Sequence, residues 1–199
     1  MTTHIGLLRA INLGPHNRVA MKELCALLGS LDLHEPRSLL QSGNVIFGCD
    51  AKSTAKLEGA LEAALAKRLK VATDFFVRTA KEWQAIIAAN PFPKQAKDDP
   101  GHLILMCLKD APERAAVTAL QQAIVGRETV RADGRQAYIV YPDGVGQSKL
   151  TIKLIEKHLA TRGTGRNWNT VLKLGAIAGA SSAFAPGASA DKKDPPLQA

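Results

Sequence analysis

The sequence predicts an α+β fold in which two tandem ferredoxin-like halves, each with the element order βαββαβ, form antiparallel sheets. Short apolar runs of strand length alternate with segments whose apolar residues recur at helical spacing. The same order of elements restarts after a proline-containing break at residues 90–93. We therefore expect an N-terminal half over residues 1–79, a connecting helix and linker over 80–101, a C-terminal half over 102–178 and a disordered tail over 179–199.

The elements expected in the first half are strands over 5–11, 38–40, 45–47 and 75–77 and helices over 21–28 and about 53–70. Turn-forming residues follow the first strand at Asn12, and Gly43 with Asn44 tolerates the positive φ that the hairpin between the middle strands requires. The second helix carries its leucines on one side, so Glu58 and Glu62 are expected on its solvated side.

A helix over 80–89 connects the halves and ends before Pro91, because proline cannot continue a helix. The polar stretch over 94–101 is expected to be an exposed linker. The elements expected in the second half are strands over 102–108, 129–131, 137–141 and 166–171 and helices over 112–124, about 148–159 and 172–178.

The composition favours a cytoplasmic protein with an anionic partner. The formal net charge of +8 favours nucleic acid or a nucleotide as partner. No apolar run approaches the roughly 20 residues that cross a bilayer, so no membrane association is expected. The three cysteines lie far apart without CxxC spacing, which indicates neither a disulfide framework nor a zinc site. No metal or cofactor is predicted.

The segment from Gly144 to Lys149 is the most suggestive of ligand chemistry. Two glycines lead from a strand into a helix expected to begin near Ser148, where backbone N–H groups and Lys149 could hold an anion. The P-loop pattern GxxxxGK[ST] is absent. Alternatively, the segment is an ordinary strand-to-helix turn with Ser148 as the helix N-cap.

Basic residues recur after this turn. Lys149, Lys153 and Lys157 are spaced four apart and share a predicted helix face. This face either contributes to a basic groove or is a solvated surface, since a lysine stem covers apolar area while its head stays in water.

The cluster from Arg166 to Asn169 combines a cation, two amides and an indole. Arg166 would pair with a phosphate, Trp168 would stack on a base, and Asn167 and Asn169 would hydrogen-bond to it. Alternatively, Trp168 faces the core and its polar neighbours cap turns.

Further candidate ligand-binding residues gather in the first half, around the exit of the first strand and on the hairpin. Arginines and amides near strand ends can form a binding site, although several of these residues are equally suited to forming turns. They are Arg9, Asn12, Asn17, Gln41, Ser42 and Asn44.

These features favour a non-catalytic binder of an anionic ligand, either nucleic acid or a nucleotide. The alternative is a small-molecule enzyme that holds a phosphorylated substrate at residues 144–149. The sequence shows no histidine pair at HxH or HxxxH spacing and no G-x-S-x-G elbow, so no catalytic residue is assigned.

Several strings together resemble a bacterial family called domain of unknown function 1697. The matching strings occupy residues 7–14, 17–24, 41–47, 89–92, 147–150 and 164–171. Pro15 with His16 and the Ala/Pro-rich tail depart from the family pattern. The resemblance implies a stand-alone cytosolic α+β protein and assigns no biochemical role.

Overall fold

The computed structural model describes residues 1–12, 18–51 and 53–182. The first half contains β1 (Thr2–Leu8), α1 (Met21–Gly29), β2 (His34–Leu39), β3 (Asn44–Cys49), α2 (Thr54–Arg68) and β4 (Phe75–Thr79). Its four strands form an antiparallel sheet in the order β2-β3-β1-β4. A core of leucine, valine and phenylalanine side chains fills the space between this sheet and helices α1 and α2.

The rest of the chain builds a second sheet. Its elements are α3 (Ala80–Ala88), α4 (Pro93–Asp98), β5 (Leu103–Leu108), α5 (Arg114–Ala123), β6 (Thr129–Asp133), β7 (Gln136–Val140), the 3₁₀ turn η1 (Val145–Gln147), α6 (Ile152–Leu159), β8 (Gly163–Asn167) and α7 (Trp168–Ser182). The strand order is β6-β7-β5-β8, again antiparallel. The predicted α+β fold with two antiparallel sheets is confirmed.

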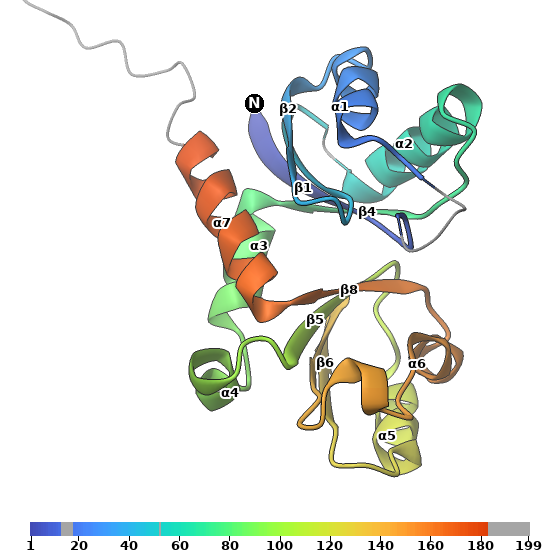
Figure 1. The fold of residues 1–199 in the computed structure, drawn as a ribbon, viewed down its shortest axis with the longest axis vertical. Coiled ribbons are helices and arrows are strands. Elements are labelled where there is room, and N and C mark those ends of the chain that lie inside the picture. Colours follow the sequence, from blue (N-terminus) through green and yellow to red (C-terminus); the bar gives the residue numbers. More distant parts are fainter. Residues whose placement is uncertain (13–17, 52, 183–199) are drawn as a thin grey trace, which may run out of the picture.

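The two sheets share one core. Figure 1 shows α3 and α7 side by side where the two sheets meet, and buried residues of both sheets pack with these helices. Trp83 on α3 donates its indole N–H to the carbonyl of Val171 on α7 at 3.0 Å. The hydroxyl of Tyr138 on β7 donates to the carbonyl of Ile86 on α3 at 2.7 Å. The two halves therefore bury apolar area against each other through α3 and α7.

The halves also meet through two arginines at equivalent strand positions. In the first sheet β1 pairs Ile5 with Arg78, and in the second sheet β5 pairs Leu105 with Arg166. Each arginine crosses to the other half and donates to the last residue of its first strand: Arg78 to the Leu108 carbonyl at 2.9 Å, and Arg166 to the Leu8 carbonyl at 2.9 Å. The interface thus has an approximate internal two-fold symmetry.

The residues after these first strands repeat the symmetry. Lys109 donates to the Phe75 carbonyl and to Glu62 on α2, both at 2.5 Å. Arg9 donates in the same way to the Gly163 carbonyl at 3.2 Å and to Glu156 on α6 at 2.8 Å. Each half therefore places a cation against a glutamate of the other half.

The structure corrects the expectation that Glu58 and Glu62 are solvated. Glu58 is only 3% exposed and accepts from the backbone N–H of Val77 at 2.8 Å and from Lys109 at 2.9 Å. The helical pattern placed both glutamates opposite the leucine stripe, but the second half covers that side of α2 and supplies the cations.

The positions of three helices, α4, α6 and α7, also differ from prediction. The polar stretch after Pro93 forms α4, because a proline in the first turn is already preorganised for a helix. Helix α6 begins at Ile152 rather than near Ser148, since the Thr151 side chain provides the cap by accepting from the N–H of Leu154.

The end of the second half is helical earlier and further than expected. Strand β8 ends at Asn167, whose side chain accepts from the N–H of Thr170 at 3.0 Å and so starts α7 at Trp168. Helix α7 continues to Ser182 because it packs on α3 and on the first sheet, so the tail does not begin at Gly179. Residues 183–199 of the predicted tail lie outside the described residues.

Candidate functional site

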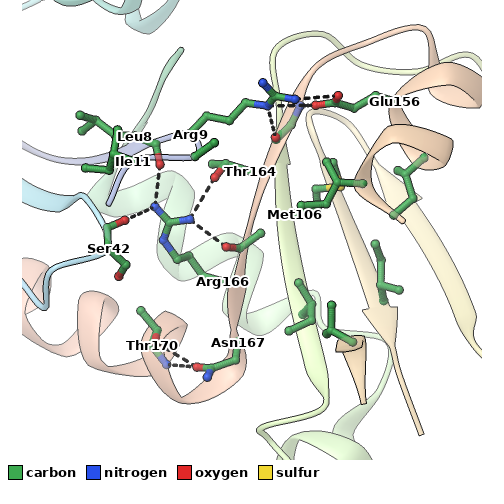
Figure 2. Close-up of a pocket in the computed structure, with 18 of the residues that line it drawn as sticks. Leu8, Arg9, Ile11, Ser42, Met106, Glu156, Thr164, Arg166, Asn167 and Thr170 are labelled. Carbon is green, nitrogen blue, oxygen red and sulfur yellow. Dashed lines mark hydrogen bonds and ion pairs between the residues drawn. The ribbon is translucent and has the colours of Figure 1, made fainter. Parts of the chain in front are cut away.

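A cavity of about 770 Å³ lies between the halves, on the face of the second sheet that also packs against α5 and α6. Aliphatic side chains of the second half line it, including Ile104, Met106, Ile139 and Ile155. The first half closes one side with the end of β1 and with the β2–β3 hairpin, which bring Leu8, Ile11 and Leu40 to the wall. Figure 2 shows Leu8 and Ile11 on one side of this space and Met106 on the other.

Two glycines on the edge strand β8 create the room for this cavity. Gly163 and Gly165 pair with Leu108 and Met106, so they belong to the sheet face that carries the cavity. A Cβ atom at Gly165 would lie 3.0 Å from a methyl carbon of Ile104, and one at Gly163 would collide with Met106. Side chains at these two positions would occupy the volume that is now open.

Arg166 lies at the cavity wall, and its guanidinium group donates hydrogen bonds to other groups of the protein. Its Nε donates to Asn44, its Nη1 to Thr164 at 3.0 Å, and its Nη2 to the carbonyls of Leu8 and Ser42 at 2.9 and 3.0 Å. Figure 2 shows the hydrogen bonds from Arg166 to Leu8 and Ser42 of the first half and to Thr164 on β8. Burial lowers the pKa of Arg166 to about 10, which leaves the guanidinium charged at neutral pH. Its main role in this structure is to join the halves.

Two other cations line the cavity. Arg9 is paired with Glu156, which also accepts from the backbone N–H of Gly163 at 2.9 Å. Lys153 on α6 is exposed and, among the described residues, forms no ion pair or side-chain hydrogen bond. The ammonium of Lys153 is therefore the charge at the rim that a ligand can use without breaking an existing pair.

The structure brings part of the predicted ligand-binding set to this cavity. Arg9, Ser42, Arg166 and Asn167 line it. Asn44 lies directly behind Arg166, buried, and donates to the Leu39 carbonyl at 2.9 Å.

The remaining first-half candidates shape the loops beside the cavity. Asn12 donates to the carbonyl of Gln41 at 2.8 Å and to that of Val19 at 3.1 Å, so Asn12 ties the exit of β1 to the hairpin. The Gln41 side chain is exposed. Asn17 lies outside the described residues.

Four candidates of the second half do not line the cavity. The Ser148 hydroxyl donates to Glu128 and accepts from the N–H of Leu150 at 2.9 Å. Trp168 is 3% exposed and packs in the shared core beside Tyr138, which leaves almost none of its ring available for stacking. Lys149 and Asn169 are exposed. The cluster Arg166–Asn169 therefore divides between the interface, a helix cap, the core and the surface.

Sequence reasoning missed most of the cavity wall. Glu156, Thr164 and Thr170 line it without having been singled out. The alternate glycines of β8 were the available signal, since glycine inside a strand often marks the close approach of another group.

Within the described residues, no helix combines the length and the apolar character that crossing a bilayer requires. The same residues hold no group of three or more histidine, cysteine, aspartate or glutamate side chains placed to bind a metal ion.

Comparison with known proteins identifies a family. A family model described as "Protein of unknown function (DUF1697)" matches residues 1–138. A conserved bacterial protein from Streptococcus pneumoniae has a similar structure, with a TM-score of 0.70 and 22% sequence identity over 89% of this chain and 98% of that chain. At this identity the likeness shows a shared fold alone. No curated protein matches the chain. The chain belongs to the DUF1697 family of proteins of unknown function.

Proposed function

We propose that this chain binds a small anionic molecule with an apolar body in the cavity between its halves. The observation that carries the proposal is the cavity itself, which lies within the size range of small-molecule sites and combines aliphatic walls with a few polar groups. The hydroxyl groups of Thr164 and Thr170 and the Ser42 side chain supply such groups on the side of Arg166.

Lys153 indicates that the ligand is an anion. A ligand in the cavity would exclude water beside the Lys153 ammonium, and the attraction between this ammonium and an anion becomes stronger as the local dielectric constant falls. Arg9 adds a second cation whose pairing with Glu156 is only partly buried. A nucleotide is one ligand that joins a planar aromatic base to an anionic group.

A fluorescent probe with this chemistry tests the proposal. We expect anilinonaphthalene sulfonate to bind the folded protein at one site, because the probe joins an aromatic body to a single anionic group. Lys153→Ala should weaken the probe about tenfold, the effect of one charge-assisted contact. The matched control is Lys157→Ala, which removes an exposed lysine of the same helix that does not line the cavity.

Filling the cavity gives the second arm of this test. Val145→Trp adds bulk at an exposed position of the rim, and Gly165→Val fills the floor. Both variants should abolish probe binding while the far-ultraviolet circular dichroism stays native. Unchanged binding in folded Val145→Trp would refute the proposed site.

Nucleic acid is a second candidate partner, favoured by the exposed Lys153 and Lys157, which are one turn apart on α6, and by the exposed Lys149 that precedes this helix. A single-stranded oligonucleotide bound there should lose affinity steeply as salt increases, and Lys149→Ala with Lys157→Ala should reduce the slope. Oligonucleotide binding that Val145→Trp leaves intact would assign nucleic acid to the lysine surface and not to the cavity.

We also infer that each half is a ferredoxin-like unit, with the boundaries 1–79 and 102–178 and a connection over 80–101. The repeated βαββαβ order and the matching strand orders of the two sheets support this division. A cytoplasmic location belongs to the same proposal, and the free thiols of Cys25, Cys49 and Cys107 are consistent with a reducing compartment.

A further inference from the structure

We infer that the ligand presents a carboxylate to the backbone N–H of Gly165, in the place that the Glu58 carboxylate occupies in the first half. This inference rests on the proposed function and names the chemical class of its ligand. The molecule has an approximate internal symmetry, and its two halves contain one filled and one open version of the same site.

Two glutamates fix the correspondence between the halves. Glu62 on α2 accepts from the N–H of Phe75, the first residue of β4, at 2.8 Å. Glu156 on α6 accepts from the N–H of Gly163, the first residue of β8, at 2.9 Å. Glu62 therefore corresponds to Glu156, and one turn earlier on each helix Glu58 corresponds to Ile152.

The first half shows what a carboxylate does at this place. Glu58 is buried and accepts from the N–H of Val77, two residues along the edge strand from Phe75. It also accepts from Lys109 at 2.9 Å, the cation contributed by the other half. The groups that hold this carboxylate are thus an outward N–H of an edge strand and a cation across the interface.

The second half keeps both of these groups but lacks the carboxylate. Gly165 stands at the position of Val77, and Arg9 stands at the position of Lys109. Along an antiparallel edge strand, N–H groups point outward at every second residue. Since Gly163 donates outward to Glu156, the N–H of Gly165 also points away from β5, and no described side chain accepts from it.

The cavity opens at the same place. Helix α2 begins about two turns before Glu62, whereas α6 begins about one turn before Glu156, so the sheet beneath the missing turn is uncovered. Gly165 and Ile152 both line the cavity, and Ile152 is 47% exposed. A carboxylate entering here would meet the free N–H of Gly165 with Arg9 and Lys153 as nearby cations, and its apolar body would lie along Ile104 and Met106.

A comparison of three ligands with apolar chains of similar length and different head groups tests this inference. Octanoate, octyl phosphate and octanamide are titrated calorimetrically against the full-length protein. We expect octanoate to bind at least about tenfold more tightly than octanamide, and more tightly than octyl phosphate, because the site matches the planar carboxylate of Glu58. In amide NMR spectra, octanoate should shift the Gly165 N–H at concentrations at least about tenfold lower than octanamide does.

A carboxylate supplied by the protein should compete with the ligand. Ile152→Glu places a carboxylate where Glu58 stands in the first half, and we expect it to weaken octanoate at least about tenfold. Ile152→Gln is the control for size. Ile152→Asp is the control for charge, because its side chain is one methylene shorter than that of Ile152→Glu; we expect it to weaken octanoate much less.

The outcomes separate this inference from the proposed function. If octanoate fails to bind the wild-type chain, or binds Ile152→Glu as tightly as Ile152→Asp, the carboxylate inference is wrong. In that case, retained binding of anilinonaphthalene sulfonate that Val145→Trp blocks would still support the proposed anionic ligand. Loss of both signals would remove the cavity as a binding site.

Discussion

Glu58 is the residue whose surroundings differ most from those its sequence position indicates. Its carboxylate lies 3.5 Å from Arg78 and 3.7 Å from Arg135, in addition to its hydrogen bond from Lys109. None of the three cations is on α2. Arg78 lies on β4, and Lys109 and Arg135 belong to the other half of the chain. A buried glutamate and the cations around it compensate each other's charge. Removing the carboxylate or a cation leaves a buried charge without compensation, which destabilises the folded state.

We therefore expect Glu58→Ala to lower the free energy of unfolding by about 3–5 kcal/mol, because the buried Arg78 would lose its counter-charge, while Lys109 would keep only Glu62. Urea denaturation followed by tryptophan fluorescence measures this loss. Glu23→Ala, at an exposed position of α1, is the matched control and should change stability by less than about 0.5 kcal/mol. A similar small change in Glu58→Ala would show that the cations are already solvated.

His4 gives a prediction about pH. Its ring is buried and stacked on Phe47, its Nδ1 lies 2.9 Å from the Thr2 carbonyl, and its Nε2 has no partner in the described residues. Burial lowers the pKa of His4 from 6.5, while the Thr2 carbonyl and the carboxylates of Glu82 and Asp50 act in the opposite direction with smaller effect.

The unfolded chain thus binds a proton on His4 at a higher pH than the folded chain does. The contribution of neutral, buried His4 to the free energy of unfolding is complete above the pKa of about 6.5 in the unfolded chain. This contribution is lost as the pH falls below that value towards the lower pKa of the folded chain. Urea denaturation at about pH 7.5 and about pH 5.5 should show this loss, and the loss should be smaller in His4→Leu. Equal pH dependence in both proteins would assign the effect to other groups.

At the scale of elements, helix α6 decides how much of the second sheet stays open. Thr151 caps this helix, and Ser148 is occupied by Glu128, so the cap determines where the helix starts. We expect Thr151→Ala to cost about 1 kcal/mol in thermal or chemical unfolding. Lys149→Ala, two residues earlier and exposed, should leave stability unchanged. A larger cost at Lys149 than at Thr151 would contradict this assignment of the cap.

Element type could be predicted from the sequence wherever one local signal dominated. The leucines of α1 and α2 and the apolar run of β5 occur where periodicity places them. Prediction failed where two local signals competed. Asn167 and Thr170 form a helix cap inside a stretch that alternates polar and apolar residues like a strand, so the start of α7 was misplaced.

The candidate site was less predictable because its parts meet only in the folded chain. Arg9 and Arg166 could be selected as chemically useful, but their partners Glu156, Leu8 and Ser42 come from the opposite half. Contacts between residues far apart in the chain depend on how the halves pack and not on the spacing of residues in the sequence. The sequence therefore could not show that both arginines already have hydrogen-bond partners within the protein. The cavity depends on the absence of side chains at Gly163 and Gly165, and both glycines lie before residues 166–171, where the strand was predicted.

At the scale of the whole molecule, the shared core makes the halves mutually dependent. Helix α7 follows the last strand of the second sheet, yet its buried residues pack with α3 and with β1 and β3 of the first sheet. Arg78 and Arg166 hold the same interface from both sides. Removing either half would expose the apolar face that carries Ile5 and Leu7 in the first sheet, or Leu103 and Leu105 in the second.

We therefore expect the two sheets to unfold in one cooperative transition. Leu174→Ala, at a fully buried position of α7, should cost about 2–5 kcal/mol because it leaves a cavity in the shared core. Native-state hydrogen exchange should show the same loss of protection for the slowest amides of β3 in the first sheet and β7 in the second. If β7 kept its protection while β3 lost it, the halves would be independent units, and a site built between them would open whenever the first half unfolds.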